Sequence, residues 1–270
     1  MMTKIDWITF EDNEFYHDQS RNGKYMSSHM LGDFSKSPLL YNKKVLGQIE
    51  EKDSAAYAFG SAAHKLILEG RDAFDAEYII SDGPINERTG KAYGKETQAF
   101  KSWAAVQGGK NIITTEDFGM CAKFQHSVWK NEAAAELLSK GVAEGVVRTE
   151  LEGVPCQIRM DWFNPDKGLV DYKTTLDLDY FESEVRRWGY IRQMAFYRAV
   201  IAQVTGQKVE VHIIATEKCE PYRTGVWKIA PYLLDEFEQI VFALLRKYKS
   251  CKESNVWPTG YETVRLIDNN

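Results

Sequence analysis

Between residues 156 and 175 the sequence has two runs in which apolar and polar residues alternate, separated by a turn. The runs are CQIRMDW (156–162) and GLVDYKTT (168–175), and the residues between them include Asn, Pro, Asp and Lys. Alternation with a period of two is typical of β-strands, and such a short polar connection joins adjacent antiparallel strands. The chain is therefore expected to contain a β-hairpin here.

This hairpin carries two carboxylates and an ammonium group. Successive side chains of a strand point to opposite faces, so Asp171 and Lys173 share one face while Val170 and Tyr172 share the other. Asp161 lies opposite or diagonal to Asp171 if the strands pair around the turn. Two carboxylates so close repel each other unless a cation neutralises them, and Mg²⁺ and Mn²⁺ prefer oxygen ligands. The hairpin is therefore a candidate metal site.

A further candidate ligand lies in residues 54–69, which are expected to form a helix. Gly60, His64 and Leu68 are four residues apart and fall on one inward-facing stripe. A single histidine on such a stripe is more often a hydrogen-bonded core residue than a ligand. The two carboxylates of the hairpin favour the metal-ligand interpretation for His64.

A long helix is expected after the hairpin, ending near Val204. Tyr190, Gln193 and Tyr197 lie on one face of it, at spacings of three and four. A buried amide and a buried phenol need hydrogen-bond partners, so these groups could orient Lys173 or a substrate phosphate. The alternative is that they belong to the packing face of an amphipathic helix.

These motifs together resemble the PD-(D/E)xK nuclease superfamily. Asp161 followed by Asp171-Tyr172-Lys173 is similar to its D…(D/E)xK core. Residues 60–64, from glycine to histidine, resemble the GxxxH helix of members that process DNA ends, and residues 193–197 resemble their QxxxY helix. The strongest resemblance is to phage and prophage exonucleases of the RecE type (exodeoxyribonuclease VIII), from about residue 28 to the Trp-Pro pair at 257–258.

The resemblance implies an α/β fold with a restriction-endonuclease-like core, a central mixed sheet flanked by helices. It implies a metal-dependent exonuclease that degrades one strand of linear double-stranded DNA from its 5′ end, leaving 3′ overhangs for phage-type recombination. His64, Asp161, Asp171 and the Tyr172 carbonyl would hold Mg²⁺ or Mn²⁺, with two ions in each site. Lys173 would orient or deprotonate the attacking water, with its pKa lowered by the metal charge.

The resemblance also assigns residues around this centre. Glu144 best matches a glutamate that precedes the first strand of the sheet, and Glu150, on the strand itself, is the alternative. Gln193 and Tyr197 would complete the catalytic set. Contacts to DNA are expected from polar and basic residues in two helical or loop segments and on the hairpin, namely Ser35, Lys36, Arg88, Lys91, Lys95 and Arg159.

Relatives of the RecE type form rings and act with a single-strand annealing protein. A homo-oligomeric ring, of trimeric or tetrameric size, and an annealing partner are therefore expected here. Two alternatives remain. One is an endonuclease or a helicase-associated nuclease of the same superfamily, although the chain has no Walker motif for a motor of its own. The other is a non-catalytic protein that binds DNA ends.

Length, composition and net charge limit the classes of protein to which the chain can belong. The 270 residues, 44% of them hydrophobic, suit one domain with a helical part (about 26–140), a sheet core (about 141–230) and a terminal helix and tail (231–270). No run approaches the roughly 18 apolar residues of a membrane span, and no signal peptide is evident, so a cytoplasmic location is expected. The net charge of −5 argues against a broadly basic nucleic-acid binder but permits a nuclease with a local basic groove.

The four cysteines are widely separated and form no CxxC pair, which argues against zinc, a disulfide framework or the iron–sulfur cluster of some relatives. They are expected to be structural thiols at Cys121, Cys156, Cys219 and Cys251.

Two segments have no clear periodicity. Residues 1–25 are expected to form an arm or an irregular strand. Residues 81–95 are rich in turn formers and are expected to form a loop.

Overall fold

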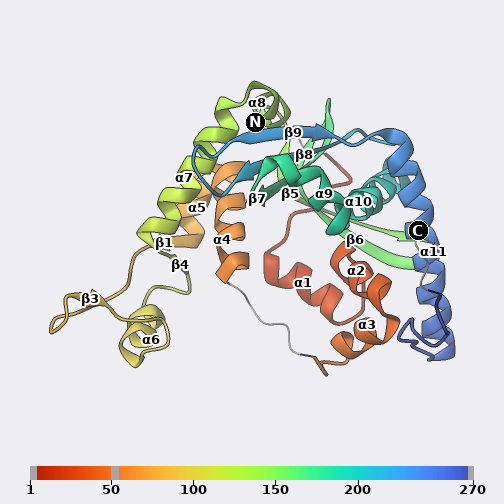
Figure 1. Ribbon diagram of the computed structural model, residues 1–270, viewed down its shortest axis with the longest axis horizontal. Helices are drawn as coiled ribbons and strands as arrows, with labels where there is room; N and C mark the ends of the chain where they lie inside the picture. The colour runs from red at the N-terminus through yellow and green to blue at the C-terminus, as the bar shows by residue number, and fades with distance from the viewer. Residues whose placement is uncertain (1–4, 50–54, 267–270) are drawn as a thin grey trace.

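The computed structural model describes residues 5–49 and 55–266, and its centre is a mixed five-stranded sheet with helices on both faces (Figure 1). The strands follow the order β5-β6-β7-β8-β9. Their bounds are β5 Val142–Leu151, β6 Val154–Asn164, β7 Gly168–Thr175, β8 Val211–Glu217 and β9 Thr224–Lys228. Neighbours are antiparallel except β7 and β8, which are parallel. The predicted α/β class, with a central mixed sheet flanked by helices, is confirmed.

Strands β6 and β7 form the predicted hairpin. Trp162 pairs with Val170, and Asn164 pairs with Gly168 at the turn. Gly168 has a φ of +89°, and a Cβ atom built on it would lie 2.2 Å from the carbonyl oxygen of Glu210. A residue with a side chain would be strained and would clash here, so this corner of the sheet requires glycine.

The described residues form eleven α-helices. They are α1 Asn13–Arg21, α2 Ser28–Lys36, α3 Pro38–Val45, α4 Ala55–His64, α5 Gly70–Glu77, α6 Gln98–Ala105, α7 Thr115–Lys130, α8 Glu132–Leu138, α9 Phe181–Arg187, α10 Tyr190–Thr205 and α11 Pro231–Ser254. A π-helical turn, η1 (Lys65–Glu69), joins α4 to α5, and a 3₁₀ turn, η2 (Leu178–Tyr180), precedes α9. Within the described part of the chain, none of the helices has both the length and the apolar character that crossing a membrane requires.

Serine side chains cap the N-termini of α2 and α3. Ser27 Oγ accepts a hydrogen bond from the Met30 N–H at 3.3 Å, and Ser37 Oγ accepts one from the Leu40 N–H at 3.4 Å. Pro38 follows as the first residue of α3, where a missing N–H costs nothing because no acceptor faces that position. These caps fix where α2 ends and α3 begins.

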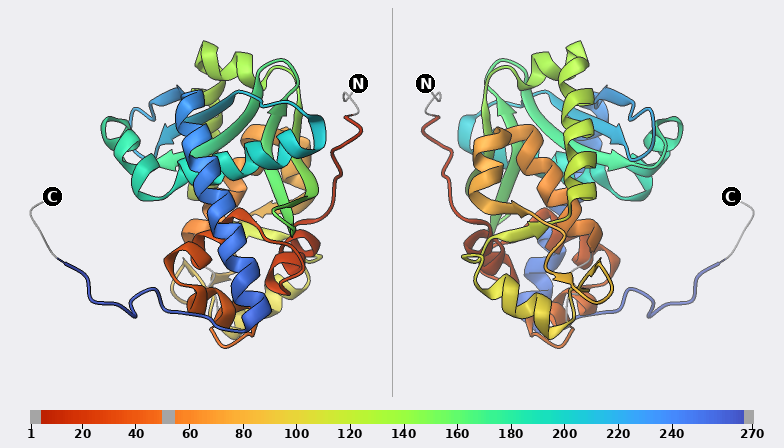
Figure 2. Two further views of the ribbon diagram at one scale, coloured as in Figure 1. Left: turned by 90° about the vertical axis from the view of Figure 1, so that its right-hand side faces the viewer. Right: turned by 90° about the vertical axis from the view of Figure 1, so that its left-hand side faces the viewer.

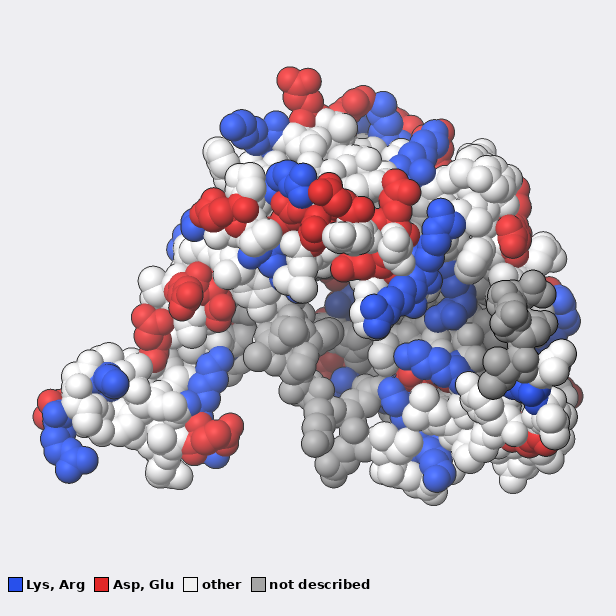
Figure 3. Space-filling view, in the orientation of Figure 1, with Lys and Arg blue, Asp and Glu red and all other residues white. Residues whose placement is uncertain are grey.

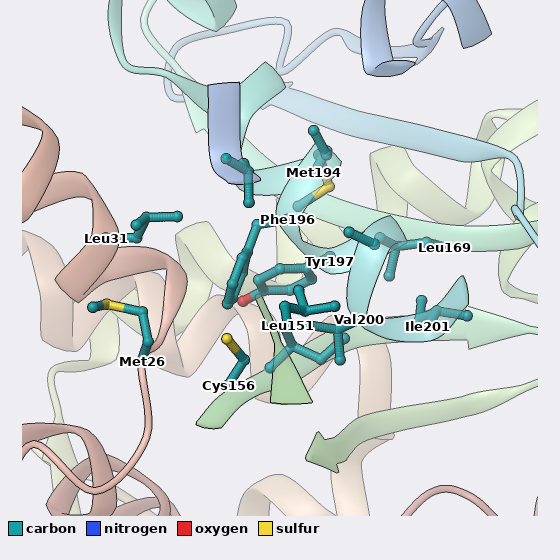
Figure 4. Packing of buried hydrophobic residues seen from close by; sticks show 14 of the residues in the cluster. Met26, Leu31, Leu151, Cys156, Leu169, Met194, Phe196, Tyr197, Val200 and Ile201 are labelled. Carbon is teal, nitrogen blue, oxygen red and sulfur yellow. The ribbon is translucent and has the colours of Figure 1, made fainter. Parts of the chain in front are cut away.

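Two apolar cores lie on the two faces of the sheet. The first packs beneath α10 and α11 and includes Leu169 of β7, whereas the second packs beneath α4, α7 and α8 and includes Val170 and Tyr172. Phe196 and Tyr197 of α10 lie among the side chains of the first core (Figure 4). The alternation read from the sequence therefore assigns the faces of β7 correctly.

The outer layer of the first face is α11. The chain after it first packs against α3, where Trp257 stacks on Tyr41, and its last described residues extend away from the rest of the protein (Figure 2). On the other side, a small lobe stands apart from the sheet (Figure 1). It contains α6 and the pair of β2 (Ile85–Asn86) with β3 (Lys91–Ala92). The pair of β1 (Tyr78–Ile80) with β4 (Asn111–Ile113) connects the lobe to the second core, which includes Tyr78 and Ile113.

Four local expectations need correction. The N-terminal segment contains α1, because the Asp12 carboxylate accepts the Phe15 N–H at 2.7 Å and caps a helix. The expected loop 81–95 includes the β2–β3 hairpin. The helix expected over 54–69 ends at Glu69 as predicted, because Gly70 has a φ of +85°, but its last turn, η1, is π-helical, and residue 54 lies outside the described residues. Three of the cysteines are buried, but Cys219 is exposed and is not a packing thiol.

Candidate active site

The regular alternation of side chains along β6 is interrupted next to Asp161. Ile158, Met160 and Phe163 all belong to the first core, although strict alternation would turn Phe163 to the opposite face from Met160. Glu144, which lies across from Asp161 in the β5–β6 register, has a φ of +55°. Local distortion of both strands therefore accompanies the two carboxylates, as a bulge-like irregularity often does where a strand must re-aim a side chain.

The β6–β7 ladder ends at the Trp162–Val170 pair, and the Asp161 side chain lies beyond it. Asp161 Oδ2 accepts a hydrogen bond from the Tyr172 N–H at 2.8 Å and lies 3.5 Å from His64 Nδ1. Asp161 thus links the two strands of the hairpin to the end of α4.

His64, Glu144 and Asp161 form a group of potential metal ligands. One ligand atom from each lies within 4.8 Å of the other two. The His64 ring also packs edge-on against Tyr172, with ring centroids 5.1 Å apart. Burial lowers the pKa of His64, so its imidazole is neutral and can donate a lone pair to a metal. Two carboxylates and one imidazole suit a divalent cation such as Mn²⁺ or Mg²⁺.

Asp171 and Lys173 form a buried ion pair on the face of the sheet that α10 covers. Lys173 Nζ lies 2.6 Å from Asp171 Oδ2, and Asp171 as a whole is 1% exposed. Asp171 Oδ1 is buried and accepts no hydrogen bond from the described residues. Buried carboxylate oxygens are normally satisfied, so this atom fits a site completed by a cation.

Burial raises the pKa of Asp171 to about 7, with Lys173 opposing the effect and the charge of Asp161 adding to it. Burial also raises the pKa of Glu144 to about 7, against the opposing charge of Arg159. For Lys173, burial favours the neutral amine, but Asp171 and Asp161 outweigh it and raise the pKa above its ordinary value. Without a metal, Lys173 is therefore an ammonium group, and a Lys173 pKa lowered by metal charge stays a prediction for the metal-bound site.

Comparison with known proteins identifies the family at this point. Residues 27–270 match the family described as "PDDEXK-like domain of unknown function (DUF3799)". The chain belongs to this PDDEXK-like family. A crystal structure from Eubacterium rectale, described as a "Putative exonuclease", has a similar fold, with a TM-score of 0.67 and 20% sequence identity over 97% of each chain. No curated protein matches the sequence.

In this PDDEXK-like chain, the predicted face of α10 that carries Tyr190, Gln193 and Tyr197 lies next to the site. The Tyr190 ring lies with its centroid 5.1 Å from Lys173 Nζ. Burial and the charge of Asp161 raise the pKa of Tyr197 to about 12, whereas hydrogen bonds with Ser28 and Gln193 act in the opposite direction. The structure therefore places Tyr190, Gln193 and Tyr197 between the carboxylates and α2.

Of the two candidate glutamates, Glu144 lies at the site. It belongs within β5 rather than before it, and Arg159 Nε lies 2.8 Å from its Oε2. Glu150 is exposed and lies near the other end of β5, opposite Pro155. Arg159 also lies over the Tyr16 ring, 5.2 Å from its centroid, so this predicted DNA contact is engaged within the protein.

The other predicted DNA contacts fall in two places. Arg88, Lys91 and Lys95 are exposed on the lobe around β2 and β3, which stands apart from the β5–β9 sheet (Figure 1). Ser35 and Lys36 lie at the end of α2, where Ser35 Oγ accepts a hydrogen bond from Arg192 at 3.2 Å. The sequence interpretation did not include Arg192 among the site residues, although its position directly before the QxxxY motif was a usable signal.

Metal-free protein is expected to lose stability as the pH rises from about 4 to above 7. The pKa of Asp171 and of Glu144 is raised to about 7 in the folded protein. The folded state therefore binds more protons than the unfolded chain in this range, and the free energy of unfolding falls as each carboxyl group ionises. Because a divalent cation would replace these protons, Mg²⁺ or Mn²⁺ is expected to raise the Tm more at about pH 8 than at about pH 5.

Thermal unfolding with EDTA or with Mn²⁺, measured at both pH values, checks this expectation. Asp171→Asn is the control, because it removes one of the two titrating groups and should flatten the pH dependence seen in EDTA. A metal-induced shift in Tm of the same size at both pH values would contradict it.

Proposed function

We propose that this protein is a metal-dependent exonuclease of the RecE type, acting on linear double-stranded DNA from its 5′ ends and leaving 3′ overhangs for recombination. The observation that carries the proposal is the buried Asp171–Lys173 pair beside the group of His64, Glu144 and Asp161. The sequence motifs of the RecE type support the same activity, and so does the description of the structurally similar Eubacterium rectale protein.

The donor atoms fit a divalent cation. Carboxylate oxygens of Asp161 and Asp171 and the neutral imidazole of His64 would hold it, with the Tyr172 carbonyl as a further ligand and two ions in the complete site. Glu144 would join the ligands when Arg159 releases it. When bound, the metal supplies a Lewis acid and an activated water at the scissile phosphate.

The protein's own residues then have separate tasks. The Lys173 ammonium group stabilises negative charge on the phosphate and orients the attacking water, and its pair with Asp171 keeps it in place. The Tyr190 ring covers the ammonium group on the α10 side. Tyr197 bonds to both Gln193 and Ser28, and through these hydrogen bonds Gln193 and Tyr197 would position the centre.

The wider biological setting is also part of the proposal. A single-strand annealing protein would receive the 3′ overhang, and a homo-oligomeric ring would hold the duplex during successive cleavages. Both would act in the cytoplasm of a bacterial host cell. Arg88, Lys91 and Lys95 would contact the duplex from the lobe.

Digestion of linear duplex DNA labelled at either the 5′ or the 3′ end, with Mg²⁺ or EDTA, tests the activity. Metal-dependent release of 5′ label as mononucleotides, with 3′ label retained on long single strands, is the expected result. Covalently closed circular DNA should remain intact, and its cleavage would instead indicate an endonuclease. Binding of DNA ends without hydrolysis under any divalent metal would indicate a non-catalytic end-binding protein.

A further inference from the structure

A cavity of about 220 Å³ lies between α2 and the first turns of α10. Its polar and aromatic lining includes Ser28, Lys36, Trp188, Tyr190, Arg192 and Gln193. Tyr190 and Gln193 are also neighbours of the proposed catalytic centre, since Tyr190 covers Lys173 and Gln193 bonds to Tyr197. The cavity therefore adjoins that centre along α10.

Arg192 is a half-buried cation in this cavity that lacks a counter-ion among the described residues. Its Nη1 atom donates to Ser35 Oγ at 3.2 Å. Its Nη2 atom lies between two glycines, since Cβ atoms built on Gly32 and Gly189 would come within 3.3 Å and 3.1 Å of it. Burial alone lowers the pKa of the guanidinium group. A partly desolvated guanidinium with donors to spare is costly unless an anion binds it.

The acid in the cavity wall does not supply that anion. Asp33 Oδ2 lies 2.7 Å from Lys44 Nζ and 3.5 Å from His29 Nε2, so its charge is already matched on α2 and α3. Lys36 adds a second positive charge to the lining. Lys and Arg side chains gather on this face of the protein, over α2, α3 and the α9–α10 region (Figure 3).

We infer that this cavity is a second phosphate site, in which Arg192, Ser35 and Lys36 bind a phosphate group of the DNA strand being hydrolysed. The inference rests on the proposed function for the identity of the strand. Arginine binds phosphate oxygens through two parallel N–H groups, and lysine and serine add a charge and a hydroxyl donor. The bound group is either the terminal phosphate of the strand or an internal phosphate beside the one that is cleaved.

Trp188 extends this site toward a base. Trp188 is 59% exposed at the rim of the cavity, where contact with water does not stabilise a large apolar ring. Stacking of a base on an aromatic ring tolerates any sequence, as an exonuclease requires. A strand held by its phosphate at Arg192 and by its base at Trp188 would present the neighbouring phosphate to Lys173.

DNA binding in EDTA tests this site without any hydrolysis. Fluorescence anisotropy of short duplexes ending in a 5′-phosphate or a 5′-hydroxyl is compared for the wild type, Arg192→Gln and Arg186→Gln. Arg186 is the matched control, because it is an exposed arginine of α9 outside the cavity. Arg192→Gln is expected to weaken binding about tenfold or more, whereas Arg186→Gln should leave it nearly unchanged.

The two duplexes distinguish the sources of the phosphate. Loss of binding for the 5′-phosphate duplex alone assigns the cavity to a terminal phosphate, and equal loss for both assigns it to an internal one. Lys36→Gln serves as a second variant at an exposed position, where folding is not at risk, and should reduce the salt dependence of binding. Equal affinities of Arg192→Gln, Lys36→Gln and Arg186→Gln would overturn the inference.

The outcome is separable from that of the nuclease proposal. A protein that binds through Arg192 but hydrolyses no DNA with any metal would retain the phosphate site and lose the proposed activity. A protein that hydrolyses DNA with Arg192→Gln and Arg186→Gln equally competent in binding would retain the activity and lose the site.

Discussion

Lys173→Ala is expected to lower the rate of DNA hydrolysis about 10³-fold, with little change in the affinity for DNA. The ammonium group is partly buried beside Asp171 and is positively charged in the metal-free protein. A fixed positive charge in a poorly solvated site stabilises a transition state far more than the same charge in water does. Its removal also leaves Asp171 without its partner, which disfavours the ionised carboxylate that a metal needs.

Steady-state hydrolysis of an end-labelled duplex with saturating Mg²⁺ measures this effect. Lys167→Ala is the matched control, because Lys167 lies in the turn of the same hairpin and pairs with Glu136 at the surface. Lys167→Ala should retain normal rates. If Lys173→Ala retained them too, Lys173 would have no part in the chemistry, and the Asp171–Lys173 pair would be structural.

The hairpin was predictable because its information is local. A period of two determines which side chains share a face of the strand. Asp171 and Lys173 were therefore predicted on one face, with Val170 and Tyr172 on the other. His64 could be predicted for a similar reason. Helical spacing placed it on an inward-facing stripe, and the two carboxylates of the hairpin favoured its assignment as a metal ligand.

The ligand group itself was less predictable. From the hairpin alone, Asp161 and Asp171 are expected to form the ligand pair, yet the group of potential metal ligands found among the described residues is His64, Glu144 and Asp161. Glu144 joins this group because its backbone has a φ of +55° and the side-chain alternation of the neighbouring strand is interrupted. The sequence pattern shows neither irregularity. Its pairing with Arg159, fifteen residues later, depends on the β5–β6 register.

Contacts between distant segments that carry no recognised motif were not predictable from the sequence. The Arg192–Ser35 hydrogen bond joins residues 157 positions apart, across the packing of α10 on α2. No periodicity in either segment encodes that approach. The cavity between them, and the absence of a described carboxylate beside Arg192, are properties of the folded arrangement.

Asp161→Asn is expected to weaken Mn²⁺ binding at least about 100-fold and to abolish hydrolysis. Asp161 approaches His64 and Glu144 and accepts the Tyr172 N–H. Asparagine has the same shape and keeps an oxygen acceptor for that N–H, so the hairpin should fold normally. It lacks the charge that attracts the metal, and it relieves repulsion with Asp171 and Glu144. The Tm in EDTA should therefore hold or rise.

Calorimetric titration with Mn²⁺, together with Tm measurements in EDTA, separates these two effects. Asp166→Asn is the matched control, because Asp166 is an exposed residue of the hairpin turn that pairs with Lys140. It should bind Mn²⁺ like the wild type. A lower Tm in EDTA for Asp161→Asn with unchanged Mn²⁺ affinity would mean that Asp161 only holds the two strands together. A variant that folds stably but no longer binds metal would instead show that a bound cation offsets the electrostatic repulsion between these carboxylates.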